Sequence, residues 1–221
     1  MIVSCLIDWF KGNLKVHTYT IRSDTDYKTF FINTTTTAED VIRMVLSKFK
    51  LAFRDPKLFY LTMEIKTKLG GVDVVNEIEL GDEARPLELQ SCHPRDKSSF
   101  VLKMHTGVPV RIYDYFLSNN SNYKSVMISK KTTCEEAVSL MLQSLRLQSP
   151  TDHFLLVCVD TTTGYEFALP PEASLLAVVE QGDSAQQIHI RSLSNRRKIT
   201  DRSDFQPVME DLHGKMESFA V

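Results

Sequence analysis

The amino-acid sequence repeats itself at an offset of 96 residues, and this repeat constrains the fold more than any other feature. Residues 13–64 align with residues 109–160 without a gap, so that Tyr27–Thr29 falls on Tyr123–Ser125. The period is longer than the roughly 20 to 50 residues of a solenoid repeat. The repeat therefore predicts a duplicated small domain, and a chain of 221 residues has room for two domains of about 100 residues each.

Each copy begins with the pattern of a β-hairpin. Two extended, β-rich stretches are separated by short runs of Ser, Asp and Asn, and such residues between two strands favour a tight turn. In the first copy these strands are predicted at Leu14–Ile21 and Tyr27–Asn33. In the second copy they are predicted at Val110–Leu117 and Tyr123–Ser129.

A helix follows the hairpin in each copy. Thr37 and Thr133 each precede an acidic residue three positions later, which is the pattern of a capping box at a helix start. Apolar residues then recur at helical spacing and predict one buried stripe per helix. Further strands are predicted after the helices, at Leu58–Ile65, Ser99–Met104, Phe154–Val159 and Gln187–Arg191. The order of elements predicts an α+β fold, with one main helix laid across a mixed sheet in each copy.

Composition and motifs exclude several classes of function. A formal net charge of −2 argues against a nucleic-acid binder, and no apolar run reaches the ~18 residues needed for insertion into a membrane. The four cysteines are scattered, so no zinc site is predicted, and free thiols without a secretory signal are typical of the cytoplasm. The sequence has none of the nucleotide-binding, hydrolase or zinc-protease motifs. We therefore expect no enzyme, no catalytic residues, no cofactor and no metal.

Several segments of the two copies resemble a known family, the Ras-association domains. The resemblance rests on the Tyr-Lys-Thr/Ser start of the second strand, the Thr-rich helix start, and the segments Lys48–Leu51, Leu80–Gln90 and Ser99–Lys103. It implies two tandem ubiquitin-like β-grasp domains. On this basis we divide the chain into a lead-in (1–11), a first Ras-association domain (12–106), a second one (107–195) and a tail (196–221).

The resemblance also implies a partner, a GTP-loaded Ras or Rap protein whose edge strand pairs with the second strand of the domain. Charges beside the strand would select that partner, because main-chain pairing alone is unselective. Residues 13–57 carry a net charge of +3, whereas residues 109–153 carry +1, so we expect the first copy to be the main binding domain. Six side chains match the family's basic positions or lie beside them, and they are the predicted contacts: Lys15, Lys28, Arg43, Lys48, Arg111 and Lys124.

Two alternatives stay open from the sequence. The chain fits a ubiquitin-like protein–protein scaffold that binds no GTPase, because fold does not fix function. It also fits the regulatory fragment of a larger signalling enzyme. The short junction at residues 105–109 favours a fixed arrangement of the two copies and is compatible with simultaneous or homodimeric engagement. If the partner is a GTPase, we expect a cytoplasmic protein that the GTPase recruits to the plasma membrane.

Overall fold

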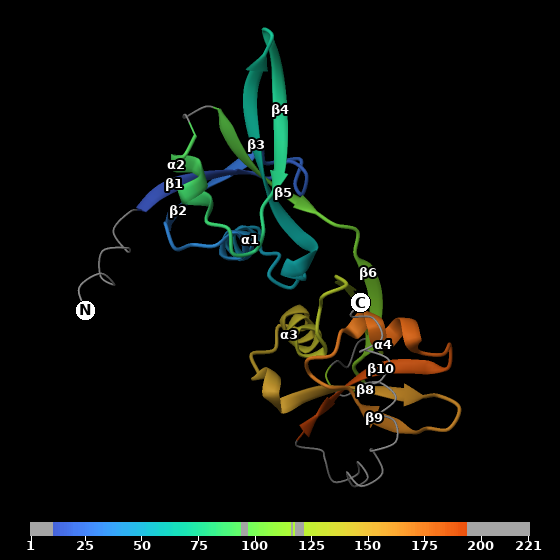
Figure 1. The fold of residues 1–221 in the computed structure, drawn as a ribbon. Helices are drawn as coiled ribbons and strands as arrows, with labels where there is room; N and C mark the ends of the chain where they lie inside the picture. Colours follow the sequence, from blue (N-terminus) through green and yellow to red (C-terminus); the bar gives the residue numbers. More distant parts are fainter. Residues whose placement is uncertain (1–10, 94–96, 116, 118–121, 194–221) are drawn as a thin grey trace, which may run out of the picture.

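The computed structural model describes residues 11–93, 97–115, 117 and 122–193 of the chain. They form two mixed sheets of five strands, one for each sequence repeat, and a helix packs on each sheet (Figure 1). Except for Lys11, the predicted lead-in lies outside the described residues, and so does the tail.

The first domain has the strand order β2-β1-β5-β3-β4. β1 and β2 pair antiparallel as a hairpin, and β1 pairs in parallel with β5, which makes the sheet mixed. The elements are β1 (Lys11–His17), β2 (Tyr27–Asn33), α1 (Ala38–Lys48), η2 (Pro56–Leu58), β3 (Phe59–Leu69), β4 (Val72–Glu79), α2 (Pro86–Ser91) and β5 (Ser98–Met104).

The second domain repeats this plan in the order β7-β6-β10-β8-β9. Its elements are β6 (Val108–Tyr113), β7 (Tyr123–Ile128), α3 (Cys134–Ser144), η3 (Thr151–His153), β8 (Phe154–Asp160), β9 (Glu166–Ala168), α4 (Leu175–Gln181) and β10 (Gln186–Ser192). The sequence prediction of two tandem ubiquitin-like β-grasp domains is therefore confirmed.

The main helices begin where the sequence predicts. The Thr37 side chain accepts a hydrogen bond from the Asp40 backbone, and the Asp40 carboxylate accepts one from the Thr37 backbone. Thr133 and Glu136 form the same capping box at the start of α3. Each box satisfies two of the N–H groups that a helix start leaves free, which fixes the first turn.

Each domain has its own apolar core between helix and sheet. In the first domain Val41, Val45 and Leu46 of α1 pack with Leu14 and Phe30 of the sheet. The corresponding core of the second domain is built around α3 and the inward-facing residues of β6, β7, β8 and β10: Val110, Ile112, Val126, Ile128, Val138, Met141, Leu142, Leu156, Cys158, Ile188 and Ile190. Burial of one face of each element is the main favourable contribution to folding.

Both main helices end in the same unusual backbone conformation. Lys50 has a φ of 58° and Arg146 a φ of 57°, in the left-handed region that favours glycine. The amide of the next residue then reaches back into the helix, from Leu51 to the Leu46 carbonyl at 2.8 Å and from Leu147 to the Leu142 carbonyl at 2.9 Å. These bonds satisfy carbonyl groups that a helix end leaves free.

The main differences from the sequence prediction are two strands that end earlier and two strands that were not predicted, one of which is the short β9. β1 ends at His17 rather than at Ile21, because the Thr18 carbonyl accepts bonds from the Ile21 and Arg22 amides and starts a turn. β6 likewise ends at Tyr113 rather than at Leu117. β4 was not predicted; it continues from β3 through Gly70 and Gly71 as a hairpin that projects from the first sheet (Figure 1).

Candidate functional site

β2 is an edge strand of the first sheet. Within the described residues it pairs with β1 alone, so one side of its backbone has no partner strand. β7 occupies the same edge position in the second domain. Unpaired N–H and C=O groups on such an edge can accept a strand from another protein.

The side chains of β2 alternate between two faces of the sheet. Phe30 and Ile32 are buried toward α1, and Lys28 shares their face by alternation. Tyr27 and Phe31 point to the opposite, exposed face. The predicted contact residues therefore flank the β2 edge from both sides and do not form one continuous surface.

On the helix side, basic residues surround the Phe49 ring at the end of α1. The Lys28 Nζ lies 5.8 Å from the centroid of this ring, and the Arg22 guanidinium lies 5.7 Å from it. Lys48 is the last residue of α1 and precedes Phe49 directly. Sequence reasoning identified Lys28 and Lys48 but missed Arg22, which lies in the turn between β1 and β2.

On the opposite face, Lys15 of β1 lies beside the aromatic residues of β2. Its Nζ is 3.9 Å from the centroid of the Tyr27 ring, within the range of a cation–π contact. Phe31 is 66% exposed, which is unusual for a large apolar side chain on an ordered strand. Sequence reasoning missed Phe31, although its position one residue after buried Phe30 already predicts an outward direction.

The charges of the predicted lysines remain available in the first domain. No ion pair joins Lys15, Lys28 or Lys48 to a carboxylate within the part of the chain that the structure describes. Arg43 differs, because its guanidinium binds the Glu39 carboxylate of the same helix at 2.7 Å. Arg43 is therefore the predicted residue least suited to attract an acidic partner.

The second domain has a weaker version of this arrangement. The Arg111 guanidinium lies 5.4 Å from the centroid of the Tyr123 ring, as Lys15 does beside Tyr27. Ser139 and Ser144 stand where the first domain has Arg43 and Lys48. Asp114 is fully buried near Lys124; burial raises the pKa of this carboxyl, and the Lys124 charge opposes that rise. The β7 edge therefore carries fewer free positive charges than the β2 edge.

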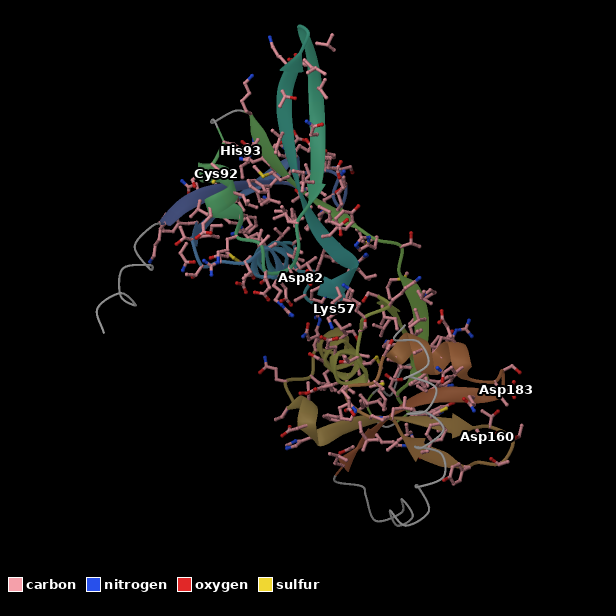
Figure 2. The ribbon with its side chains drawn as sticks, viewed as in Figure 1. Lys57, Asp82, Cys92, His93, Asp160 and Asp183 are labelled. Atoms are coloured by element: carbon pink, nitrogen blue, oxygen red, sulfur yellow. The ribbon has the colours of Figure 1, made fainter. Side chains whose placement is uncertain are left out.

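A cleft of ≈ 430 Å³ lies between the domains, away from the β2 edge, and its lining mixes basic residues such as Lys57 with acidic residues such as Asp82 (Figure 2). Among the described residues, no group of three His, Cys, Asp or Glu side chains could hold a metal ion. Cys158 is buried, and burial raises the pKa of Cys134 to about 12. No described helix is long and apolar enough to cross a membrane.

Comparison with known proteins gives one family. The model of the Ras association (RalGDS/AF-6) domain matches the chain twice, at residues 10–107 and 106–199. Among curated proteins no sequence matches the chain.

Several solved structures are similar to single domains of the chain. The Rasip1 RA domain is 23% identical, with a TM-score of 0.33, over 39% of this chain and 87% of that one. The RA domain of a guanine nucleotide exchange factor for Rap1 is 13% identical, with a TM-score of 0.34, over 44% and 88%. The putative Ras interaction domain of AFD-1 from Caenorhabditis elegans is 17% identical, with a TM-score of 0.33, over 42% and 94%.

Proposed function

We propose that this chain, which belongs to the Ras association (RalGDS/AF-6) domain family, binds a GTP-loaded Ras or Rap protein, chiefly through its first domain. Members of the family are non-catalytic modules that bind Ras-family small GTPases. The binding edge is β2, and an edge strand of the GTPase adds to the sheet antiparallel to it. The bounds proposed for the two domains are residues 12–106 and 107–195.

The observation that carries this proposal is the combination of a free strand edge with unpaired positive charge on both of its sides. Backbone pairing along β2 supplies affinity, and the lysines select an acidic partner. Lys28 and Lys48 flank the edge on the helix side, and Lys15 flanks it on the other. Exposed Phe31 adds apolar area beside the strand.

The proposal assigns a lesser role to the second domain. Its β7 edge has the same geometry, with Arg111 and Lys124 in the positions of Lys15 and Lys28. It lacks the basic residue at the end of the helix, where Ser144 stands in place of Lys48. We assign it weaker binding or structural support. Through a membrane-anchored GTPase, the whole chain would be recruited from the cytoplasm to the plasma membrane.

Calorimetric titration tests the proposal. The full chain is titrated with Ras and Rap proteins loaded either with a non-hydrolysable GTP analogue or with GDP. We expect micromolar affinity, worth about 8 kcal/mol, for the GTP form only. A stoichiometry of one GTPase per chain would agree with the first domain as the main site, and two would mean that the β7 edge also binds.

Charge-reversal variants identify the binding edge. Lys28→Glu and Lys48→Glu should each weaken binding at least tenfold, since each replaces attraction by repulsion. Arg43→Glu should have a smaller effect, because Glu39 already neutralises this guanidinium. Lys68→Glu is the matched control; it lies on the projecting β3–β4 hairpin, away from β2, and should bind like the unaltered chain. Retained affinity in both Lys28→Glu and Lys48→Glu would contradict the proposed edge.

A further inference from the structure

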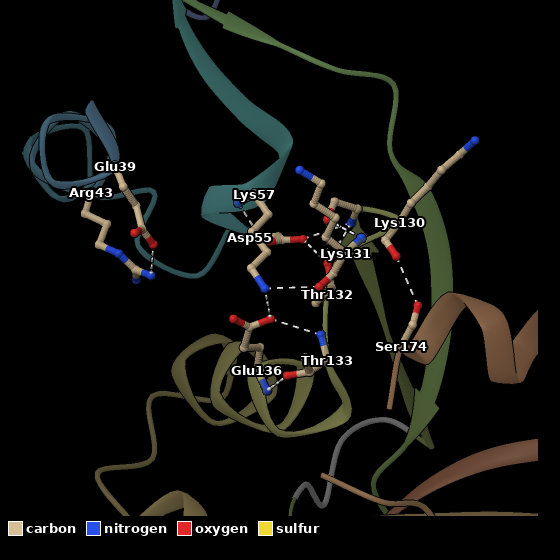
Figure 3. Close-up of polar contacts among 11 residues, drawn as sticks. Glu39, Arg43, Asp55, Lys57, Lys130, Lys131, Thr132, Thr133, Glu136 and Ser174 are labelled. Carbon is tan, nitrogen blue, oxygen red and sulfur yellow. Dashed lines mark hydrogen bonds and ion pairs between the residues drawn. The ribbon is translucent and has the colours of Figure 1, made fainter. Parts of the chain in front are cut away.

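A polar cluster joins the two domains, and it is built around a buried carboxylate of the first one (Figure 3). Asp55 precedes η2 and is 2% exposed. Its Oδ1 accepts a hydrogen bond from the Lys57 amide at 3.0 Å, which caps η2. Its Oδ2 accepts from the Ser129 amide at 2.9 Å and from the Thr132 hydroxyl, both in the loop between β7 and α3 of the second domain.

Lys57 adds a second connection. Its ammonium group donates to the Glu136 carboxylate at 2.8 Å and to the Lys131 carbonyl at 3.0 Å. Glu136 is also the carboxylate of the capping box of α3, so the first domain contacts the start of that helix directly. Partial burial acts to raise the pKa of Glu136, but the bonds from Lys57 and from the Thr133 amide outweigh it and keep that pKa below its ordinary value.

The equivalent loop of the first domain is closed without help from outside. Asn33 and Thr36 fall on Ser129 and Thr132 in the repeat. In the first domain the Thr36 hydroxyl accepts from the Asn33 amide at 3.3 Å and donates to the Asn33 side-chain oxygen at 2.8 Å. The loop thus contains its own acceptor, the side-chain oxygen of Asn33.

The second domain lacks that side-chain carbonyl and offers only the Ser129 hydroxyl, whose oxygen lies 3.0 Å from the Thr132 hydroxyl oxygen. The Thr132 hydroxyl still accepts from the Ser129 amide, at 2.9 Å, but Ser129 has no side-chain carbonyl group to offer. The Thr132 hydroxyl donates instead to Asp55, so a carboxylate of the first domain takes the place of the asparagine oxygen. A buried hydroxyl needs such a partner, and Thr132 is fully buried.

The arrangement is not reciprocal. The positions of Asp55 and Lys57 correspond to Thr151 and His153 in the second copy, and neither can supply a carboxylate or an ammonium group. Gly107 at the junction lets the two domains approach closely. A Cβ atom added at this position would lie 2.8 Å from the Leu58 side chain of the first domain and 2.6 Å from the Met127 side chain of the second.

We propose that the loop of residues 129–136 is a docking surface for the first domain, and that Asp55 completes the fold of the second domain. The second domain then keeps its native β7–α3 loop only while the first domain is docked on it. The two domains act as one unit, with the β2 and β7 edges held in a fixed relation. This inference does not depend on the identity of any GTPase.

Hydrogen exchange of the full-length chain tests the inference, with Asp55→Asn as the main variant. Asparagine still caps η2, but its amide group turns a donor toward the Ser129 amide and the Thr132 hydroxyl. We expect exchange at residues 129–136 to rise at least tenfold, while α1 and the β1–β2 hairpin stay protected. Asp152→Asn, an exposed aspartate in the corresponding η3, is the matched control and should change nothing.

Two further variants make the test specific. Ser129→Asn added to Asp55→Asn should restore protection, because it returns to the loop the acceptor that Asn33 gives the first domain. Thr132→Val leaves the first domain unchanged but removes both the donor to Asp55 and the acceptor of the Ser129 amide, and it should raise exchange in the same segment. Unchanged exchange in Asp55→Asn, or loss of protection in the first domain as well, would overturn the inference.

Discussion

Acid should destabilise the second domain through one buried histidine, His189 on β10. This side chain is 5% exposed, and its ring stacks on those of Tyr113 and Tyr115 at centroid distances of 4.9 and 5.7 Å. The Arg191 guanidinium lies 3.4 Å from its Nδ1. Burial first, and the Arg191 charge second, lower the pKa of His189 from 6.5 to about 4; the Glu166 carboxylate, which binds Arg191, opposes this.

The size of the effect follows from linkage. Because the pKa is lower in the folded state, the unfolded chain takes up the proton first as the pH falls below 6.5, and stability is lost until about pH 4. The loss amounts to about 1.4 kcal/mol at pH 5.5 and about 2.5 kcal/mol at pH 4.5. A small domain is stable by only about 5 to 15 kcal/mol, so this is a large fraction.

Urea unfolding of the unaltered chain and of His189→Phe at near-neutral and acidic pH measures this contribution. Phenylalanine can still stack on Tyr113 but cannot take up a proton. NMR signals of second-domain residues report on that domain alone, so the first domain does not obscure the transition. The difference in unfolding free energy between the two proteins should change by about 2.5 kcal/mol between pH 7.5 and pH 4.5. A pH-independent difference, or an imidazole that titrates near its ordinary pKa, would refute the reasoning.

Two further predictions concern the helices. Lys50→Gly should stabilise the first domain by about 0.5 to 1 kcal/mol in thermal unfolding, because glycine adopts the left-handed conformation without strain. The control, Ser47→Gly inside α1, should destabilise the domain, because glycine disfavours a helix interior. Met141→Ala removes a fully buried side chain of α3 and should cost about 2 to 5 kcal/mol in urea unfolding of the second domain. Met44→Ala on α1, where the side chain is 36% exposed, should change the stability of the first domain far less; equal losses for both methionines would contradict the assignment of the core.

The fold could be predicted from the sequence where local signals and the repeat agreed. Thr37 and Thr133 marked both helix starts, and the polar turn before the β-rich stretch Tyr27–Asn33 placed β2 at its observed bounds. β4 was not predicted because it is almost wholly exposed and so lacks the alternating burial that identifies a strand. The ends of β1 and β6 were overestimated because aromatic and apolar residues continue beyond Thr18 and Asp114, where the turns that end the strands begin.

The charged residues of the candidate site were predicted, but their arrangement around the β2 edge was not. The sequence contains the information that Lys28 and Lys15 lie on different faces, because Lys28 is two residues before Phe30, and Lys15 lies between buried Leu14 and Val16. The ion pair between Arg43 and Glu39 was missed, although their spacing of four residues on the predicted helix places the two side chains side by side. The cluster around Asp55 depends on contacts between residues 74 to 79 positions apart, for which a single sequence has no local pattern.

The dependence of one domain on the other also limits how such a pair can be rearranged by gene fusion. A chain that inherited only the first copy would lose nothing at this loop, since Asn33 closes it from within. A chain that inherited only the second would lose the Asp55 carboxylate and would leave the Ser129 hydroxyl as the acceptor for Thr132 within the loop. On the proposed docking, recombination can transfer the first copy alone with this loop intact, whereas a second copy transferred alone loses the acceptor that Asp55 provides.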